Sequence, residues 1–228
     1  MGTLPKVDAL SNRMLILNLL PRLAKSKSIL NPNPIGNDKK SPSKAIEAGA
    51  GVGRITSDVL FYYVDHVDLL EPVEQFTTEA SRRLKNHSKV NEGCTFNINQ
   101  IGLQHWNPNV DEKYDLIWSQ WCLPHLSDEE LIEYLKKCKK ILKTFNQDED
   151  EFGQDGLIIV KENICNDDDY KLFDDDDSSI TRSNKAFLDI FEKSDLNIIH
   201  QEIQSGFPRE LLKVKTYALR WSQLRICI

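Results

Sequence analysis

Residues 45–54 read Ala-Ile-Glu-Ala-Gly-Ala-Gly-Val-Gly-Arg, and this stretch decides the fold. Three glycines at alternate positions follow a short apolar run and precede an amphipathic segment, which is the order of a strand, a tight turn and a helix start. About twenty residues later, Glu71 closes a second apolar run, the separation typical of a ribose-binding acid in a nucleotide-binding βαβ unit. The pattern predicts an adenosine-containing cofactor and an enzyme. A glycine turn that only packs a helix on a strand is the alternative.

The charge and hydropathy of the chain argue against nucleic-acid and membrane partners. The chain has 228 residues, with 29 Lys and Arg against 35 Asp and Glu, and a formal net charge of −6. An acidic chain is a poor match for the phosphates of nucleic acid but suits a cationic substrate. No apolar run is long enough to cross a bilayer, and the N-terminus lacks a signal-peptide pattern. We expect neither a nucleic-acid nor a membrane partner, and we expect a monomer.

The five cysteines are scattered along the chain and form no Cys-x-x-Cys pair. Reduced thiols in a cytosolic or nuclear protein are the simplest interpretation of this spacing. We therefore expect a cytoplasmic location, with the nucleus also open, and no metal site.

Apolar runs and helix signals alternate along the middle of the chain. Strands are expected near residues 44–48, 66–70, 94–99, 114–119 and 157–162, and helices near 53–62, 73–86 and 127–142. A capping box at residues 127–130 marks the start of the third helix. Nearly all-apolar strands that alternate with helices predict an α/β fold, with helices on both faces of a parallel sheet. A helix near 184–194 and strands near 196–204 and 213–220 follow, and the two strands are expected to form an antiparallel hairpin at the sheet edge.

Composition divides the chain into three parts. Residues 1–43 are expected to hold a buried helix and then, from residue 25, a flexible loop rich in Lys, Ser, Asn and Pro. Residues 44–220 form the predicted cofactor-binding domain, and residues 221–228 a tail. Within the domain, residues 146–154 form a polar insertion, and residues 167–177 form an acidic segment that leads to the helix near 184–194.

Arg54 follows the glycine turn at once. An arginine in that place suggests that the ligand's charged end is a carboxylate, held by a bidentate pair. A ligand with adenosine at one end and an amino-acid carboxylate at the other is S-adenosylmethionine.

Residues 47–54 resemble the first motif of class I S-adenosylmethionine-dependent methyltransferases. Further segments, in the same order, are similar to the protein N-terminal Xaa-Pro-Lys methyltransferases, which methylate the α-amine of proteins after removal of the initiator Met. These segments are Gly102-Leu103-Gln104, Ile117-Trp118-Ser119-Gln120-Trp121, His125-Leu126, Val160-Lys161-Glu162-Asn163, Asp177-Ser178-Ser179-Ile180-Thr181-Arg182, Phe207-Pro208-Arg209-Glu210-Leu211 and Tyr217-Ala218-Leu219-Arg220. The resemblance implies a Rossmann-like fold with a seven-stranded, mostly parallel sheet and one antiparallel strand in the edge hairpin.

Matching positions imply cofactor contacts at Gly49, Gly51, Arg54, Glu71, Gly102, Leu103, Gln104 and Gln120. By this resemblance, the first three line the methionine end of the cofactor and Glu71 binds the ribose hydroxyls. Leu103 and Gln104, which follow Gly102, border the adenine, and Gln120 contacts the amino-acid portion.

The chemistry needs a neutral amine aligned with a sulfonium methyl group. An α-amine has a pKa of about 7.7–8.0, so a nearby proton acceptor is enough and a strong base is unnecessary. His125 is the candidate base because its ordinary pKa lies near working pH. The resemblance adds Asp177 as the residue that holds the ammonium and shares its proton. The alternatives are a histidine that only caps a loop and an acidic run that is only solvated surface.

The resemblance also implies a substrate-binding set. Trp121 would stack on the first residues of the peptide and stabilise its cation, and Asn163 would bind the peptide backbone. Asp174 would pair with the lysine at the third position, and Ser179 would support the geometry. A strand-end asparagine with no ligand is the alternative for Asn163.

Taken together, these residues imply methylation of the N-terminal α-amine of Xaa-Pro-Lys proteins, ribosomal proteins among them. A small-molecule methyltransferase on the same fold and a non-catalytic peptide-binding relative stay open as alternatives. In the family, helices that precede the position of Gly2 cover the cofactor. We expect this lid to be truncated here or replaced by residues 1–43.

Overall fold

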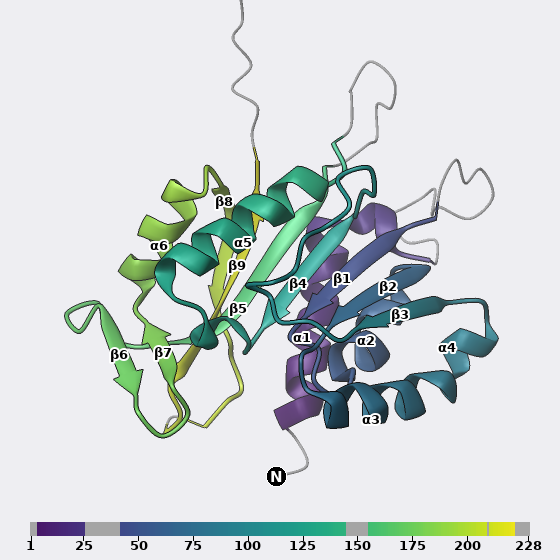
Figure 1. Cartoon of the computed structure of the whole chain (residues 1–228), viewed down its shortest axis with the longest axis horizontal. Coiled ribbons are helices and arrows are strands. Elements are labelled where there is room, and N and C mark those ends of the chain that lie inside the picture. Colours follow the sequence, from purple (N-terminus) through teal and green to yellow (C-terminus); the bar gives the residue numbers. More distant parts are fainter. Residues whose placement is uncertain (1–3, 26–41, 145–154, 209, 222–228) are drawn as a thin grey trace, which may run out of the picture.

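Seven strands form the central sheet in the order β3-β2-β1-β4-β5-β9-β8 (Figure 1). The structure, a computed structural model, describes residues 4–25, 42–144, 155–208 and 210–221. The strands of the sheet are β1 (Lys44–Ala48), β2 (His66–Leu70), β3 (Thr95–Asn99), β4 (Leu116–Gln120), β5 (Leu157–Ile164), β8 (Asn197–Ile203) and β9 (Lys213–Arg220). The first five pair in parallel, and β9 runs antiparallel to both β5 and β8. The predicted fold class is confirmed, with β8 at the edge and β9 just inside it.

Helices cover both faces of the sheet because the buried strands alternate their side chains between two apolar clusters. One cluster joins strand residues such as Ile46 and Ile117 to α5 and α6, and the other joins Ala45 and Trp118 to α1, α2 and α3. In Figure 1, α5 and α6 lie in front of the sheet and α1 lies behind it. The helices are α1 (Leu4–Leu19), η1 (Pro21–Leu23), α2 (Arg54–Asp58), η2 (Leu60–Tyr62), α3 (Glu74–Lys85), α4 (Ser88–Asn91), η3 (Leu123–His125), α5 (Asp128–Ile141) and α6 (Asn184–Lys193).

The predicted elements of the middle of the chain are confirmed to within about two residues at each end, and the capping box of α5 is present. The helix expected over 53–62 is wrong in its length. It ends at Asp58 because Val59 leaves the helical region at φ −132° and ψ −65°, and a short 3₁₀ turn, η2, follows. The helix expected before residue 25 is present as α1, which starts at Leu4 and ends at Leu19.

The acidic segment over 167–177 contains a strand that the sequence does not predict. Residues Lys171–Asp174 form β6, which pairs antiparallel with β7 (Ser179–Arg182), so this stretch carries the first strand of a hairpin. All four β6 residues are exposed, which removes the apolar alternation that signals a strand. Buried Arg182 attaches the hairpin to the body of the protein: it donates to the carbonyl oxygens of Leu123 and Leu126 and to Asp128.

Several predictions concern residues that the structure does not describe. They are the loop over residues 26–41, the insertion over 146–154, Cys227 and the tail beyond Trp221. Within the described part of the chain, no helix combines the length and hydropathy that a membrane span requires.

Glu47 gives the fold a pH dependence that can be measured. The side chain is 3% exposed, and burial raises its pKa to about 7, although the amide and hydroxyl of Thr56 both donate to it. Because the folded state holds this proton more tightly than the unfolded state does, Glu47 stabilises the fold below its unfolded pKa and loses that contribution as pH rises toward 7.

Glu47→Gln removes the titration but keeps an oxygen acceptor for Thr56. Between pH 5.0 and 7.5 the wild-type protein should lose about 2 kcal/mol more unfolding free energy than the variant does. Urea titrations at the two pH values measure this difference. Parallel pH profiles for the two proteins would contradict the assignment of the raised pKa to Glu47.

Candidate active site

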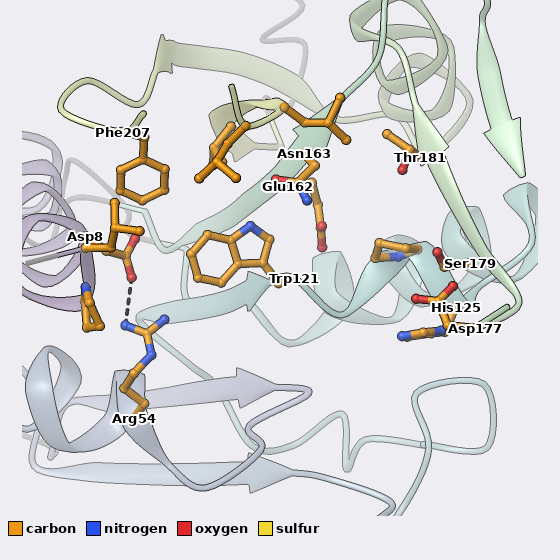
Figure 2. Close-up of a pocket in the computed structure, with 16 residues that line it drawn as sticks. Asp8, Arg54, Trp121, His125, Glu162, Asn163, Asp177, Ser179, Thr181 and Phe207 are labelled. Carbon is orange, nitrogen blue, oxygen red and sulfur yellow. Dashed lines mark hydrogen bonds and ion pairs between the residues drawn. The ribbon is translucent and has the colours of Figure 1, made fainter. Parts of the chain in front are cut away.

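A cavity of ≈ 600 Å³ opens where β4 and β5 end. Its walls come from α1, from the loop after β4, from the β6–β7 hairpin and from the segment that leads into β9 (Figure 2). The lining residues are Leu4, Pro5, Asp8, Arg54, Trp121, Pro124, His125, Glu162, Asn163, Asp177, Ser179, Thr181, Phe207, Leu211, Leu212 and Val214. The carboxyl ends of parallel strands are the usual place for a ligand site in an open α/β sheet.

Six of the predicted site residues line this cavity together: Arg54, Trp121, His125, Asn163, Asp177 and Ser179. In Figure 2, His125, Asp177 and Ser179 lie at one end and Arg54 at the other, with Trp121 and Asn163 between them. The cavity thus brings together a candidate base, a carboxylate, an aromatic ring and an amide. Some of these residues are far apart in sequence, since Arg54 and Asp177 are separated by more than a hundred residues.

Asp174 lies outside this lining. It ends β6, opposite Ser179 in the hairpin register, and its side chain is exposed. Its Oδ1 accepts a hydrogen bond of 3.0 Å from the backbone N–H of Asp176. Asp174 is therefore at the surface of the hairpin, one strand away from the cavity residue Ser179.

The glycine turn after β1 approaches the turn after β4 very closely. Gly49 has φ +59°, and a Cβ built on it would lie 2.2 Å from the Cβ of Cys122. Gly51 has φ +53°, and a Cβ there would meet no atom within 4 Å. Glu71 connects this turn to the end of β2, since its Oε2 accepts from the Gly51 N–H at 2.8 Å. A bare backbone facing open space beside a carboxylate fits the predicted cofactor.

Gly102 and the two residues predicted to border the adenine, Leu103 and Gln104, follow β3. Leu103 is 6% exposed and packs in the apolar cluster of α5 and α6, Gly102 is partly buried, and Gln104 is exposed. Leu103 would offer the adenine ring an apolar contact, and the Gln104 amide would offer it a polar one.

The Gln120 side chain makes its hydrogen bonds to other side chains of the protein. Its Nε2 donates to both carboxylate oxygens of Asp8, at 3.0 Å each, and its Oε1 accepts from Asn12 and Trp118. The side chain is therefore occupied by α1 and by its own strand, where the resemblance expects the cofactor's amino-acid portion.

Asp8 is the residue of this region that the sequence pattern missed. It is 1% exposed, and its oxygens lie 2.7 Å from the Lys161 ammonium and 2.8 Å from Arg54 Nη1. Burial by itself would raise the pKa of Asp8, but the Lys161 ammonium and then the Arg54 guanidinium bring it below its ordinary value. The signals available in the sequence were an isolated acid four residues before Asn12 on an apolar helix, and a lysine inside a buried strand.

Asp8→Asn should lower the unfolding free energy by about 3–5 kcal/mol, because it leaves the Lys161 ammonium buried without its counter-ion. Urea denaturation measures the change. As the control, Glu79→Gln removes an exposed ion pair with Arg82 and should have little effect. Equal stability of the two variants would show that α1 does not depend on this pair.

Trp121 also has an unusual backbone. Its φ is +55°, in the left-handed region that few residues other than glycine adopt. Trp121 is 39% exposed and lines the cavity, and the Arg54 guanidinium carbon lies 5.6 Å from the centroid of its ring. Next to it, burial raises the pKa of Glu162 to about 7, although the N–H groups of Leu123 and Cys122 donate to the carboxylate.

Comparison with known proteins agrees with this geometry. The family model described as AdoMet dependent proline di-methyltransferase matches residues 5–220. An alpha N-terminal protein methyltransferase 1 from Schizosaccharomyces pombe is 37% identical over 218 residues, which are 96% of this chain and 84% of that protein. An N-terminal Xaa-Pro-Lys N-methyltransferase 1 from Danio rerio is 35% identical over 187 residues, 81% of this chain and 75% of that protein.

Solved structures give the same fold. A SAM-dependent methyltransferase from Leishmania major superposes with a TM-score of 0.75 at 27% identity, covering 96% of this chain and 74% of that one. The glycopeptide N-methyltransferase MtfA in complex with S-adenosylmethionine has a TM-score of 0.58 at 12% identity, over 79% of this chain and 82% of that one, and is similar in fold alone.

Proposed function

The chain belongs to the family of AdoMet-dependent proline di-methyltransferases, and on that premise we propose that it methylates the N-terminal α-amine of proteins that begin Xaa-Pro-Lys once the initiator Met is removed. It is a methyltransferase that uses S-adenosylmethionine. The cavity supports the choice of acceptor, since it combines an aromatic ring, an amide and a carboxylate with an apolar wall.

The proposed cofactor site lies along the carboxyl ends of β1 to β4. S-adenosylmethionine supplies a methyl group on a sulfonium centre. The bare backbone at Gly51 leaves room for it, Gly49 lets the glycine turn lie against Cys122 beside that space, and Arg54 is the cation for its carboxylate. Glu71 would accept from the ribose hydroxyls while it keeps its bond to Gly51, because a carboxylate has lone pairs for both. Gly102, Leu103 and Gln104 would lie beside the adenine. To contact the amino-acid portion of the cofactor, the Gln120 side chain would have to give up its hydrogen bonds to Asp8.

His125 and Asp177 are the proposed catalytic residues. An amine must lose a proton before or as it attacks the methyl group, and it gains a positive charge as the new bond forms. His125 accepts the proton, and the Asp177 carboxylate holds the amine, shares its proton and stabilises the charge. Both lie at one end of the cavity, and both are exposed enough to pass the proton on to solvent.

The remaining lining suits a peptide that begins Xaa-Pro-Lys. Phe207, Leu211 and Leu212 form an apolar wall for the proline ring, whose fixed φ keeps the chain direction constant. Trp121 faces the cation, with a contact worth ~0.5–2 kcal/mol, and Asn163 is the backbone donor and acceptor for the peptide. Ser179 supports the wall of the cavity. An extended third residue would leave the cavity along the hairpin, where the exposed carboxylate of Asp174 can pair with its lysine.

We further propose that ribosomal proteins are among the substrates and that the enzyme acts in the cytoplasm and the nucleus. The described cysteines support a reducing compartment, since Cys94, Cys122, Cys138 and Cys165 are all free thiols.

Intact-mass measurement of peptides tests the function. With S-adenosylmethionine, an Xaa-Pro-Lys peptide should gain one or more methyl groups, and its N-acetylated form should gain none. The Xaa-Pro-Glu version should turn over much more slowly. Equal turnover of the lysine and glutamate peptides would favour a less specific methyltransferase. No turnover of any peptide, with cofactor binding intact by calorimetry, would favour a small-molecule substrate, and no cofactor binding would favour a non-catalytic binding module.

A further inference from the structure

The side chain of Glu162, near the end of β5, accepts hydrogen bonds from the loop that follows β4. The side chain is 1% exposed, and its Oε1 accepts from the backbone N–H groups of Cys122 at 2.9 Å and Leu123 at 3.0 Å. Among the residues that the structure describes, none bonds its buried Oε2. Figure 2 shows the carboxylate between Trp121 and the group that contains His125. Burying a carboxylate costs free energy, which the two hydrogen bonds to the loop after β4 offset in part.

The loop that Glu162 binds is the one that presents Trp121 to the cavity. Trp121 is held at φ +55°, a conformation that costs a non-glycine residue about 1–2 kcal/mol. The Trp121 N–H donates to the carbonyl oxygen of Lys161 at 3.1 Å, and the next two N–H groups converge on the Glu162 carboxylate. Three successive amides are thus bound by two neighbouring residues of β5, which compensates the backbone strain.

We propose that Glu162 is a positioning residue for methyl transfer, which acts through Trp121. By accepting the two amides after Trp121, it fixes the left-handed turn and so keeps the indole ring on the wall of the acceptor cavity. This role rests on the proposed function, because the ring is the surface on which the peptide N-terminus would lie. Without an acceptor at this position the turn relaxes toward an ordinary backbone conformation, and the ring leaves the cavity wall.

Two substitutions separate the acceptor from the size of the side chain. Glu162→Gln keeps an oxygen for the two amides, whereas Glu162→Met has similar volume and no acceptor of comparable strength. The Met variant should lower kcat/KM for an Xaa-Pro-Lys peptide about 10- to 100-fold, as expected for a misplaced binding surface. The Gln variant should stay close to the wild-type value, and its cofactor affinity measured by calorimetry should be unchanged. A Gln variant as impaired as the Met variant would overturn the proposal.

A double-mutant cycle tests whether Glu162 acts through Trp121. Once Trp121→Ala is present, Glu162→Met should cause little further loss, because coupled residues are not additive. The matched control pairs Glu162→Met with Phe207→Ala, a lining residue from the segment before β9, where the two losses should add. Additive losses with Trp121 would refute the role.

A measurement without turnover keeps this proposal separate from the proposed function. Acrylamide quenching of Trp121 fluorescence, isolated by subtracting the Trp121→Phe spectrum, should change in Glu162→Met and stay as in wild type in Glu162→Gln. If wild-type protein methylates no peptide, the proposed function fails, and this signal still decides the role of Glu162. Unaltered quenching in the Met variant would reject it.

Discussion

Asp177→Asn should lower the turnover of an Xaa-Pro-Lys peptide by about 10²- to 10⁴-fold, the range that a positioned proton acceptor contributes. The asparagine has nearly the same shape but cannot take a proton or balance the charge that forms on the amine. Asp177 lies at the turn of the β6–β7 hairpin, and its side chain is exposed where it lines the cavity. The loss should therefore fall on kcat, with little change in cofactor affinity or in the unfolding midpoint.

The matched control is Asp175→Asn. This residue belongs to the same exposed acidic turn but lies outside the cavity lining. It should retain most of the wild-type turnover, apart from a small effect of net charge on peptide association. If both variants keep full activity, Asp177 has no catalytic role. If both lose it alike, the acidic turn acts only as a general electrostatic field.

Gly49→Ala should weaken cofactor binding by about 100-fold or more, the effect of displacing a binding surface by roughly 1 Å. The added Cβ would lie 2.2 Å from the Cβ of Cys122, at a backbone φ of +59°. Neither atom belongs to a flexible side-chain end, so the glycine turn and the turn after β4 must separate. Because Trp121 precedes Cys122, the acceptor wall would move as well, and peptide turnover should fall with cofactor affinity. Calorimetry with S-adenosylmethionine measures the first effect.

Gly93→Ala is the control for the backbone strain alone. Gly93 also has a positive φ, +105°, but a Cβ there would meet no atom within 4 Å, and the residue lies between α4 and β3. It should lose some stability and keep its cofactor affinity. A Gly49→Ala variant that binds S-adenosylmethionine as tightly as Gly93→Ala does would show that the two turns can move apart freely.

Local patterns were enough to predict most of the sheet. The runs at 44–48 and 66–70 are apolar and end at a glycine turn or an acid, so every signal lies within a few residues of the strand it marks. The strand β6 has no such signal, since all its side chains are exposed. Its partner strand is fixed by Arg182, whose acceptors in η3 and α5 are more than fifty residues away. Spacing along the chain does not report a contact of that kind.

The same limit separates the predicted site residues from those that were missed. Arg54 and Trp121 belong to motifs that can be read as continuous segments. Asp8 and Lys161 are 153 residues apart, and each alone is an ordinary charged residue in an apolar pattern. Glu162 was part of a recognised segment, but its contact with the turn at Cys122 depends on the parallel pairing of β4 and β5.

The place of β9 has a consequence for the protein as it is made. This strand is synthesised after every other strand of the sheet, yet it lies between β5 and β8 and pairs with both. Until residues 213–220 have left the ribosome, β5 and β8 each have an edge with unpaired backbone groups. Unpaired strand edges of that kind attract other unfinished chains, so this enzyme should need chaperone protection until β9 has inserted between β5 and β8.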